Sequence, residues 1–262
     1  MKISIIMPAY NEEFRIGRTL EAYSEFFQEK KKIKEITDFE ILVVLNACTD
    51  KTLDVVREYK KTYKEIRFLE FEQGGKGFAI TEGFKDALKR DNDLIGFVDT
   101  DMSTAPEAFY DLIIHIEGVD GTIASRWING SEVIRSTGKY VRSRVFNFAV
   151  RSMGLVKQKD TQCGAKMFKR EVIEKIHPLL VLTEWAFDIN LLFVCKNNKF
   201  KIKEIPTKWK DDDKGSKILS SRTPLQMLLG AVRLRLIYSP FAELLKPVKF
   251  ILIIGDKLVN KK

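Results

Sequence analysis

The 262-residue chain has few cysteines and few histidines: Cys48, Cys163 and Cys195, and two histidines in all. The number of cysteines is odd, and no two of them have the C-x-x-C spacing. This pattern argues against a disulfide framework and against a cysteine-rich zinc site. We therefore expect a protein of a reducing compartment.

Long apolar runs are also missing. No uncharged apolar stretch approaches the ~18–20 residues that a helix needs to cross a bilayer, so an integral membrane protein is not expected. The chain turns polar directly after the short apolar run at its start, which is too short for the core of a secretion signal and predicts a first β-strand.

Acidic residues are fewer than basic ones, with 36 Asp+Glu against 45 Lys+Arg and a net charge of +9. This balance favours anionic partners such as nucleotides, phospholipid surfaces or nucleic acid, although it also describes an ordinary lysine-rich soluble surface. No recognition motif supports nucleic acid, so none is expected as a partner. The hydrophobic share of 45% is typical of globular proteins, and the length suits one large domain with or without an appendage.

The first half of the chain alternates apolar strands with segments of helical periodicity. Strands are predicted at 2–7, 39–45, 66–71, 94–98 and 121–125, and helices at 12–27, 52–63, 76–90 and 105–116. This alternation predicts an α/β fold, a mostly parallel twisted sheet flanked by helices. Ligands bind beyond the carboxyl ends of such strands, where the loops PAYNEE, NACTD, QGGKG and DTDMS fall.

The second half is less regular. We expect a loop at 128–141, helices at 142–155, 170–176 and 185–196, and extended segments at 165–168 and 199–209. The tail, 224–262, consists of amphipathic stretches broken at Pro240 and Pro247.

Asp99 and Asp101 directly follow the apolar run LIGFV. Strand alternation places both carboxylates on the same side of the strand end. Such a pair suits Mg²⁺ or Mn²⁺, which takes one or two carboxylates plus substrate phosphates, and the metal would polarise a leaving diphosphate. The alternative is a helix N-cap beside a solvated acid, because a predicted helix follows.

Three further segments fall at the same edge of the predicted sheet: 11–13, 46–50 and 74–77. Their small residues allow close approach of the backbone, and helix N-termini favour anions. Asp50 can also cap the following helix. Together with the aspartate pair, these loops predict a nucleotide site.

The motifs IIMPAYNEE, ILVVLNACTDKT, GKG and DTD, in this order, resemble the nucleotide-sugar domain of family-2 glycosyltransferases, which are inverting enzymes with the GT-A fold. KDTQCGAKMF (159–168), EWAFDINLL (184–192) and WKDDDKGSK (209–217) resemble the dolichyl-phosphate glucosyltransferases and related polyprenyl-phosphate glycosyltransferases. The resemblance implies metal-dependent transfer of a hexose such as glucose from a nucleotide sugar, UDP- or GDP-hexose, to a polyprenyl or dolichyl phosphate.

The resemblance also implies site residues. On the donor side these are Pro8, Tyr10, Glu12, Asn46, Asp50, Lys76, Asp99 and Gln162. On the acceptor side they are Arg126, Arg142, Trp185, Lys214 and Lys217. Asp99, Asp101 and Ser103 would hold Mg²⁺ or Mn²⁺, and Asp188, Asp101, Arg126 and Arg142 would carry catalysis. We expect a glycosyltransferase domain over 1–222, with a nucleotide-sugar half at 1–127 and an acceptor half at 128–222.

One position departs from the family's usual V-V-D-D-G-S pattern after the second strand, where this chain reads VVLNAC. Leu45 cannot accept the hydrogen bond from the base that the first of those aspartates accepts. Asn46 offers both a donor and an acceptor. Uridine and guanosine therefore both stay open, with a UDP-sugar favoured.

Two acceptor chemistries stay open as well. A sugar hydroxyl needs a general base, for which Asp188 is the candidate. A lipid phosphate is already ionised, and the guanidinium groups of Arg126 and Arg142 match its geometry. The alternative for Arg142 is simple solvation of a helix face.

A lipid acceptor implies a membrane surface. The segments of 223–262, apolar and edged with Arg and Lys, are predicted to lie on the cytoplasmic face of a membrane as peripheral helices. They could instead cover the sheet or form a homodimer contact. Two other functions stay open: transfer to a soluble saccharide or glycan, and a catalytically inactive nucleotide-sugar-binding protein, which the altered 46–48 loop motivates.

Overall fold

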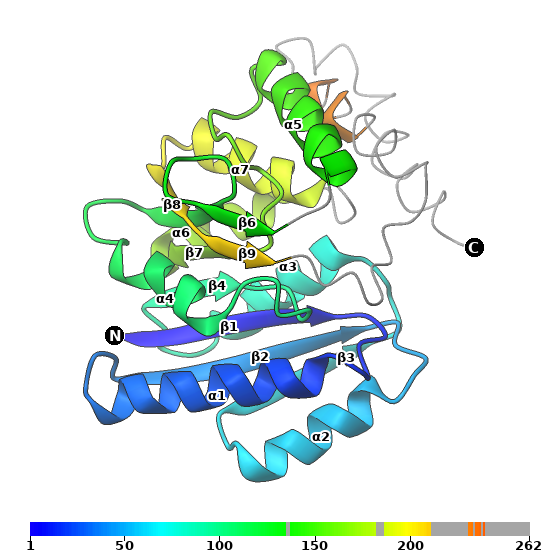
Figure 1. Ribbon diagram of the computed structural model, residues 1–262, viewed down its shortest axis with the longest axis vertical. Helices are drawn as coiled ribbons and strands as arrows, with labels where there is room; N and C mark the ends of the chain where they lie inside the picture. The colour runs from blue at the N-terminus through cyan, green and yellow to red at the C-terminus, as the bar shows by residue number, and fades with distance from the viewer. Residues whose placement is uncertain (135–136, 182–185, 211–229, 233, 237, 239–262) are drawn as a thin grey trace.

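The computed structural model describes residues 1–134, 137–181, 186–210, 230–232, 234–236 and 238 (Figure 1). The strands are β1 (Lys2–Ala9), β2 (Asp38–Asn46), β3 (Ile66–Phe71), β4 (Leu94–Phe97), β5 (Gly121–Ser125), β6 (Glu132–Ile134), β7 (Lys166–Lys169), β8 (Ile202–Pro206) and β9 (Lys208–Lys210). The helices are α1 (Ile16–Lys32), α2 (Thr52–Thr62), α3 (Lys76–Ala87), α4 (Pro106–Ile114), α5 (Thr137–Ser152), α6 (Arg170–Ile176) and α7 (Phe187–Asn197), and a 3₁₀ turn covers His177–Leu179.

Seven strands form one sheet in the order β3-β2-β1-β4-β7-β5-β8. All neighbours are parallel except β7, which runs antiparallel to both β4 and β5. The buried strands β1 and β2 read as nearly continuous apolar runs because both faces of this sheet are covered. The predicted α/β fold with a mostly parallel sheet is confirmed.

Helices cover both faces of the sheet, as Figure 1 shows. Alternate residues of β1 divide between two cores: Ile3 and Ile5 pack with α1, α2 and α4, whereas Ile6 packs with α3, α6 and α7. A third cluster joins α5 and α7 to residues 231 and 234. The carboxyl ends of β1, β2, β3 and β4 thus lie side by side between two helical layers.

The structure departs from the expectations in the second half of the chain. The loop predicted at 128–141 is wrong in part, because β6 lies within it and α5 begins at Thr137. β6 pairs in parallel with β9, so that Glu132 lies opposite Lys208. Strands of three residues carry too short a pattern for alternation to reveal them, and their partner lies far along the chain.

The sheet runs through the boundary expected at residue 127, since β7 and β8 follow it in the sequence and pair with β4 and β5. The division into a nucleotide-sugar half and an acceptor half stays a prediction. Most of the amphipathic tail, 223–262, lies outside the described residues. Within the described residues no helix is both long enough and apolar enough to cross a membrane.

Candidate active site

The loops after β1 and β2 are tied together by hydrogen bonds. Thr49 N donates to Asn11 Oδ1 at 2.7 Å, and Glu12 N donates to Thr52 Oγ1 at 2.7 Å. Ala47 N donates to Phe71 O at 2.8 Å, which joins the loop to the end of β3. The predicted convergence of these loops at one edge of the sheet is confirmed.

The DTD loop after β4 is held from α1. Thr19 Oγ1 donates to Thr100 O at 2.8 Å, and Tyr23 OH donates to Thr104 O at 2.8 Å. Both donors are fully buried, so these bonds fix the backbone on either side of Asp101. Asp101 Oδ1 accepts from Ser103 N at 2.9 Å, which closes the turn.

Asp99 lies between the ammonium of α3's first residue and a glycine. Lys76 Nζ is 2.5 Å from Asp99 Oδ1. A Cβ added to Gly164 would lie 1.8 Å from Asp99 Oδ2, so the backbone of the loop 160–164 forms the seat of this carboxylate. Burial raises the pKa of Asp99; Lys76 opposes that shift, and the carboxylates of Asp101 and Asp188 add to it. Desolvation alone would lower the pKa of Lys76, but the carboxylates of Asp99 and Asp188 outweigh it and raise the pKa.

Asp188 belongs to the first turn of α7 and approaches the same cluster from the face of the sheet that α3 also covers. Its Oδ1 lies 2.5 Å from Nζ of Lys166, a β7 residue that is completely buried. The lysine also donates to Cys163 O at 2.6 Å. Asp188 is itself nearly buried, which explains why it requires a charged partner.

The cluster contains the carboxylates of Asp99, Asp101 and Asp188 and the ammonium groups of Lys76 and Lys166. Three negative charges against two positive ones leave room for a cation. Among the described residues there is no group of three or more His, Cys, Asp or Glu side chains that could hold a metal alone.

The aspartate pair nevertheless fits Mg²⁺ or Mn²⁺, since these ions take one or two carboxylates and complete their shell with water and substrate phosphates. Ser103 Oγ is buried and has no hydrogen-bond partner within the described part of the chain. An unused oxygen beside Asp101 is what an additional ligand would offer. Asp99, Asp101 and Ser103 are thus brought together as predicted, and their metal role stays a prediction.

Arg126 forms a buried bidentate pair with Asp160. Its Nε donates to Oδ2 at 2.7 Å and its Nη2 to Oδ1 at 2.9 Å. The guanidinium lies over the rings of Trp127 and Trp209 at 5.5 and 5.1 Å. Arg126 lowers the pKa of Asp160 against the opposing effect of burial. In this conformation the Arg126 guanidinium, which was predicted to bind an acceptor phosphate, is paired with Asp160 instead. The backbone N–H of Gln162 also donates to Asp160 Oδ1, at 3.2 Å.

The other donor-side residues differ in what they offer. Tyr10 is exposed and Pro8 is half-buried at the end of β1. The carboxylate of Glu12 accepts two hydrogen bonds from Arg15, at 2.6 and 2.7 Å. Asp50 Oδ1 accepts a hydrogen bond from Thr52 N at 3.0 Å, and Thr52 is the first residue of α2. Asp50 therefore stabilises the start of this helix.

Asn46 is only 3% exposed. With its amide oriented so that Nδ2 donates to Ala9 O at 2.7 Å, Oδ1 accepts from Gly75 N at 3.1 Å. Gly75 has φ = +120°, a conformation that favours glycine, and precedes α3. The side chain therefore joins the end of β1 to the start of α3, and its second amide hydrogen and second oxygen lone pair are what it could offer to a base.

Several residues predicted for the acceptor side lie outside the part of the chain that the structure describes. Trp185, Lys214 and Lys217 are not among the described residues. Arg142 lies within α5, and the placement of its side chain is not described. Beside α5 there is a groove of about 430 Å³. It is lined by Trp127, Arg144, Val145, Asn147, Phe148, Arg151 and Lys159.

Three residues of this site were not singled out from the sequence: Asp160, Gly164 and Lys166. The available signal was the lysine in the apolar run AKMF, because a lysine within a central strand needs a charged partner.

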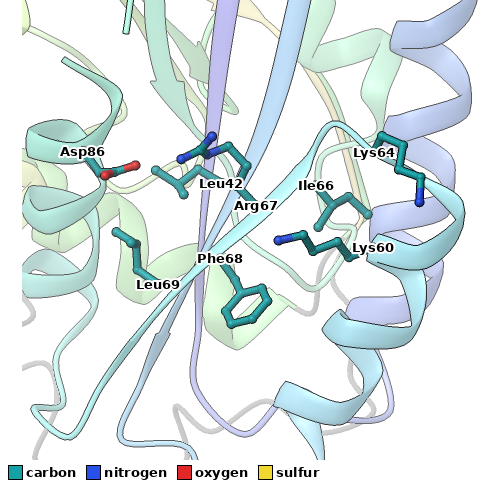
Figure 2. A pocket seen from close by; sticks show the side chains of 8 residues that line it. All are labelled: Leu42, Lys60, Lys64, Ile66, Arg67, Phe68, Leu69 and Asp86. Carbon is teal, nitrogen blue, oxygen red and sulfur yellow. The ribbon is translucent and has the colours of Figure 1, made fainter. Parts of the chain in front are cut away.

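A second cavity, of about 250 Å³, lies away from the site between α2 and β3 (Figure 2). Lys60, Lys64 and Arg67 surround it at the outer edge of the sheet.

Comparison with known proteins agrees with this geometry. The sequence profile described as "Glycosyl transferase family 2" matches residues 4–177. The chain belongs to glycosyl transferase family 2. It is therefore a glycosyltransferase, and the family expected from its motifs is confirmed.

Similar members of glycosyl transferase family 2 include two dolichyl-phosphate beta-glucosyltransferases. The protein of Dictyostelium discoideum is 31% identical over 247 residues, which cover 90% of this chain and 74% of that protein. The protein of Drosophila melanogaster is 31% identical over 239 residues, which cover 87% and 72%.

Among solved structures, a Mycobacterium tuberculosis glucosyl-3-phosphoglycerate synthase in complex with Mn²⁺, UDP and phosphoglyceric acid has the same fold. The TM-score is 0.60 at 16% identity, over 89% of this chain and 78% of that one. This likeness confirms the GT-A fold.

Proposed function

We propose that this protein transfers glucose from UDP-glucose to a polyprenyl or dolichyl phosphate at a membrane surface, with Mg²⁺ or Mn²⁺ and with inversion at the anomeric carbon. The observation that carries the proposal is the charged cluster at the carboxyl end of the sheet. Asp99, Asp101 and Asp188 meet Lys76 and Lys166 there, in a chain whose similar relatives are dolichyl-phosphate beta-glucosyltransferases.

The donor half of the proposal rests on charge. A nucleotide diphosphate with one divalent cation needs carboxylates for the metal and an ammonium for the phosphates. Asp99 and Asp101 offer the first, and Lys76, at the start of α3, offers the second. The bound metal would act as a Lewis acid that stabilises the leaving diphosphate. Lys76 would then exchange its contact with Asp99 for the incoming phosphate oxygens.

The acceptor half rests on the similar relatives and on the pairing of Asp188. An acceptor hydroxyl would need Asp188 as a free base, but its Oδ1 is bound to Lys166. A lipid phosphate arrives ionised and needs positioning by cations. The name of these relatives, beta-glucosyltransferase, agrees with inversion of an α-linked donor sugar.

The main contribution of the protein's own residues is therefore to orient the donor sugar and the acceptor. The loop 160–164 lies beside Asp99, where Gln162 and Cys163 would meet the sugar. The acceptor oxygen would attack from the face opposite the nucleotide. Holding the two reactants in line, and excluding water, are the contributions that such a site makes to the rate.

Membrane attachment is part of the proposal. The outward face of α5 carries Val145 and Phe148, which are 63% and 66% exposed, between the exposed Arg144 and Arg151. α5 contains no acidic residue. Apolar side chains flanked by arginines suit an anionic lipid surface, so α5 joins the tail 223–262 as a candidate for peripheral attachment at the cytoplasmic face. Homodimerisation stays a prediction.

The test is transfer from radiolabelled UDP-glucose, with GDP-mannose and other UDP- and GDP-hexoses alongside, to a polyprenyl phosphate in detergent. Reactions contain Mg²⁺, Mn²⁺ or EDTA, and products are extracted into organic solvent. We expect a lipid-extractable glucose product from UDP-glucose that EDTA abolishes. The Asp101→Ala variant should lack this product while it melts at the temperature of the wild type.

Other outcomes identify the alternatives. Donor hydrolysis without a lipid product would favour a soluble saccharide acceptor. Nucleotide-sugar binding without any reaction would favour a binding protein. Product formed equally in EDTA would contradict the metal requirement.

A further inference from the structure

Lys166 is a completely buried charged side chain of the site, with 0% of its surface exposed. It lies in β7, opposite Phe97 of β4 in the register of the sheet. An ammonium group in such a place has lost its hydration, which is costly unless each of its hydrogens has a partner.

The ammonium has three neighbours, two hydrogen-bond acceptors and one aromatic ring. Asp188 Oδ1 lies at 2.5 Å and Cys163 O at 2.6 Å, and the ring of Phe97 lies beneath at 5.2 Å from its centre. The carboxylate balances the charge, the carbonyl accepts a hydrogen bond, and the aromatic face attracts the cation.

Each neighbour leads to a different part of the candidate site. Cys163 precedes Gly164, whose backbone seats the Asp99 carboxylate. Phe97 is the last residue of β4, two positions before Asp99. Asp188 lies in the first turn of α7, on the side predicted for the acceptor. One side chain thus joins the strand that delivers Asp99, the loop against which Asp99 lies, and the opposing carboxylate.

We propose that Lys166 is a positioning residue that fixes the Asp188 carboxylate and the 160–164 loop relative to Asp99. The proposal rests on the proposed function, because the separation of donor-side and acceptor-side groups matters only for group transfer. With one oxygen bound to Lys166, Asp188 presents a fixed orientation to the crevice, and the same ammonium holds the Cys163 carbonyl.

The competing explanation is a core ion pair that stabilises the fold alone. The two explanations differ in what the loss of the cation does to the rate. A core pair lowers stability and leaves turnover by the folded enzyme unchanged. A positioning residue lowers kcat in protein that is still folded, since small displacements of reacting groups cost large factors in rate.

The experiment uses Lys166→Met, Asp188→Asn and the double variant in a double-mutant cycle. Methionine keeps the length of the lysine stem without its charge. Lys169→Met is the matched control, because Lys169 ends the same strand but is half-buried and lies outside the cluster. The measurements are kcat and KM for UDP-glucose, the dissociation constant of UDP with Mg²⁺, and the melting temperature.

We expect Lys166→Met to lower kcat by about 10²-fold, the factor typical of misplaced reacting groups. The dissociation constant of UDP should change by a much smaller factor, since Asp99, Asp101 and Lys76 remain. In the Asp188→Asn background, Lys166→Met should lower kcat far less than it does in the wild type, because both variants disrupt the same contact. Lys169→Met should behave like the wild type.

Should Lys166→Met fail to fold, the double variant removes both buried charges and restores a neutral interior. Its kcat relative to Asp188→Asn then still tests the coupling. A wild-type kcat in folded Lys166→Met, or fully additive losses in the cycle, would overturn the positioning role. An inactive wild type would instead contradict the proposed function itself, so the two failures are distinguishable.

Discussion

Gly164 shows how a single missing side chain shapes the candidate site. Its backbone lies directly against Asp99, and an added Cβ would come within 1.8 Å of Oδ2 and 2.3 Å of the carboxyl carbon. No real Cβ approaches a carboxylate so closely. The carboxylate can occupy its place beside Lys76 only because position 164 is glycine.

We therefore expect Gly164→Ala to displace the Asp99 carboxylate and to lower transfer by about 10²-fold, because a shift of about 1 Å in a reacting group has that effect. The measurement is transfer from UDP-glucose to a polyprenyl phosphate. Gly138→Ala is the matched control, since a Cβ added at Gly138 meets nothing within 4 Å. Equal activity of the two variants would show that Asp99 has no fixed place in catalysis.

The Arg126–Asp160 pair makes a second residue-level argument, this time about pH. Asp160 is fully buried, and Arg126 lowers its pKa against the opposing effect of burial. A carboxyl group with a lowered pKa in the folded state stabilises that state above its ordinary pKa, about 3.9. As the pH falls below that value the unfolded chain takes up the proton first, and stability is lost.

Asp160→Asn should accordingly lower the free energy of unfolding at pH 7 by about 3–5 kcal/mol, because it leaves a buried guanidinium without its counter-charge. The variant should also lose less stability than the wild type between about pH 4 and pH 3. Urea unfolding at several pH values measures both effects.

The control is Glu174→Gln, which breaks the pair of Arg170 Nε and Glu174 Oε1 at 2.6 Å. That pair is as short as the buried one but its carboxylate is half exposed, so its loss should change stability by about 0–1 kcal/mol. A similar loss in both variants would mean that burial does not distinguish the two pairs.

At the scale of elements, the regular part of the fold follows from the sequence and the rest does not. β3, β5 and α6 begin and end at the predicted residues, because strong apolar patterns end there at turn residues. β6 was not predicted, since it has only three residues and its partner lies far along the chain, whereas the extended segment expected at 199–209 covers β8 and most of β9. The same reason applies to the site. The four loops were placed by the rule for parallel strands, whereas the contacts of Lys166 and Asn46 depend on packing between distant elements.

The outward face of α5 gives a prediction for an element. Val145 and Phe148 are exposed between Arg144 and Arg151, although apolar side chains of that size are usually buried. Val145→Ser with Phe148→Ser should weaken binding to vesicles that contain phosphatidylserine, measured by co-sedimentation. Ile114→Ser is the control, since Ile114 of α4 is 53% exposed and lies outside α5. Equal vesicle binding by both variants would mean that α5 does not attach the protein to the membrane. The tail 223–262 would then be the remaining candidate for attachment.

At the scale of the whole molecule, the candidate site joins parts that are far apart in the sequence. Lys76, Asp99, Gly164 and Asp188 come from α3, the loop after β4, the loop before β7 and α7. The antiparallel strand β7 brings this about, because it lies beside β4 and carries the 160–164 loop to the carboxyl end of that strand. A ligand bound there contacts both parts of the sheet, so its binding should stabilise the entire fold.

This linkage yields a prediction that needs no acceptor. A ligand at 100 times its dissociation constant adds about 2.7 kcal/mol to the free energy of unfolding, which corresponds to a rise of roughly 5–10 °C in the melting temperature of a domain of this size. We expect UDP with Mg²⁺ to give such a rise, and Mg²⁺ alone to give little, because two carboxylates hold the ion weakly without phosphates. Asp101→Ala should melt like the wild type without ligand and show no rise with UDP and Mg²⁺. GDP under the same conditions tests the base, because Asn46, the last residue of β2 and bonded to Ala9 and Gly75, has one amide hydrogen and one oxygen lone pair left to meet either base. A larger rise in melting temperature with GDP than with UDP would reverse the preference proposed for uridine. It would not contradict the proposed metal site at the aspartate pair.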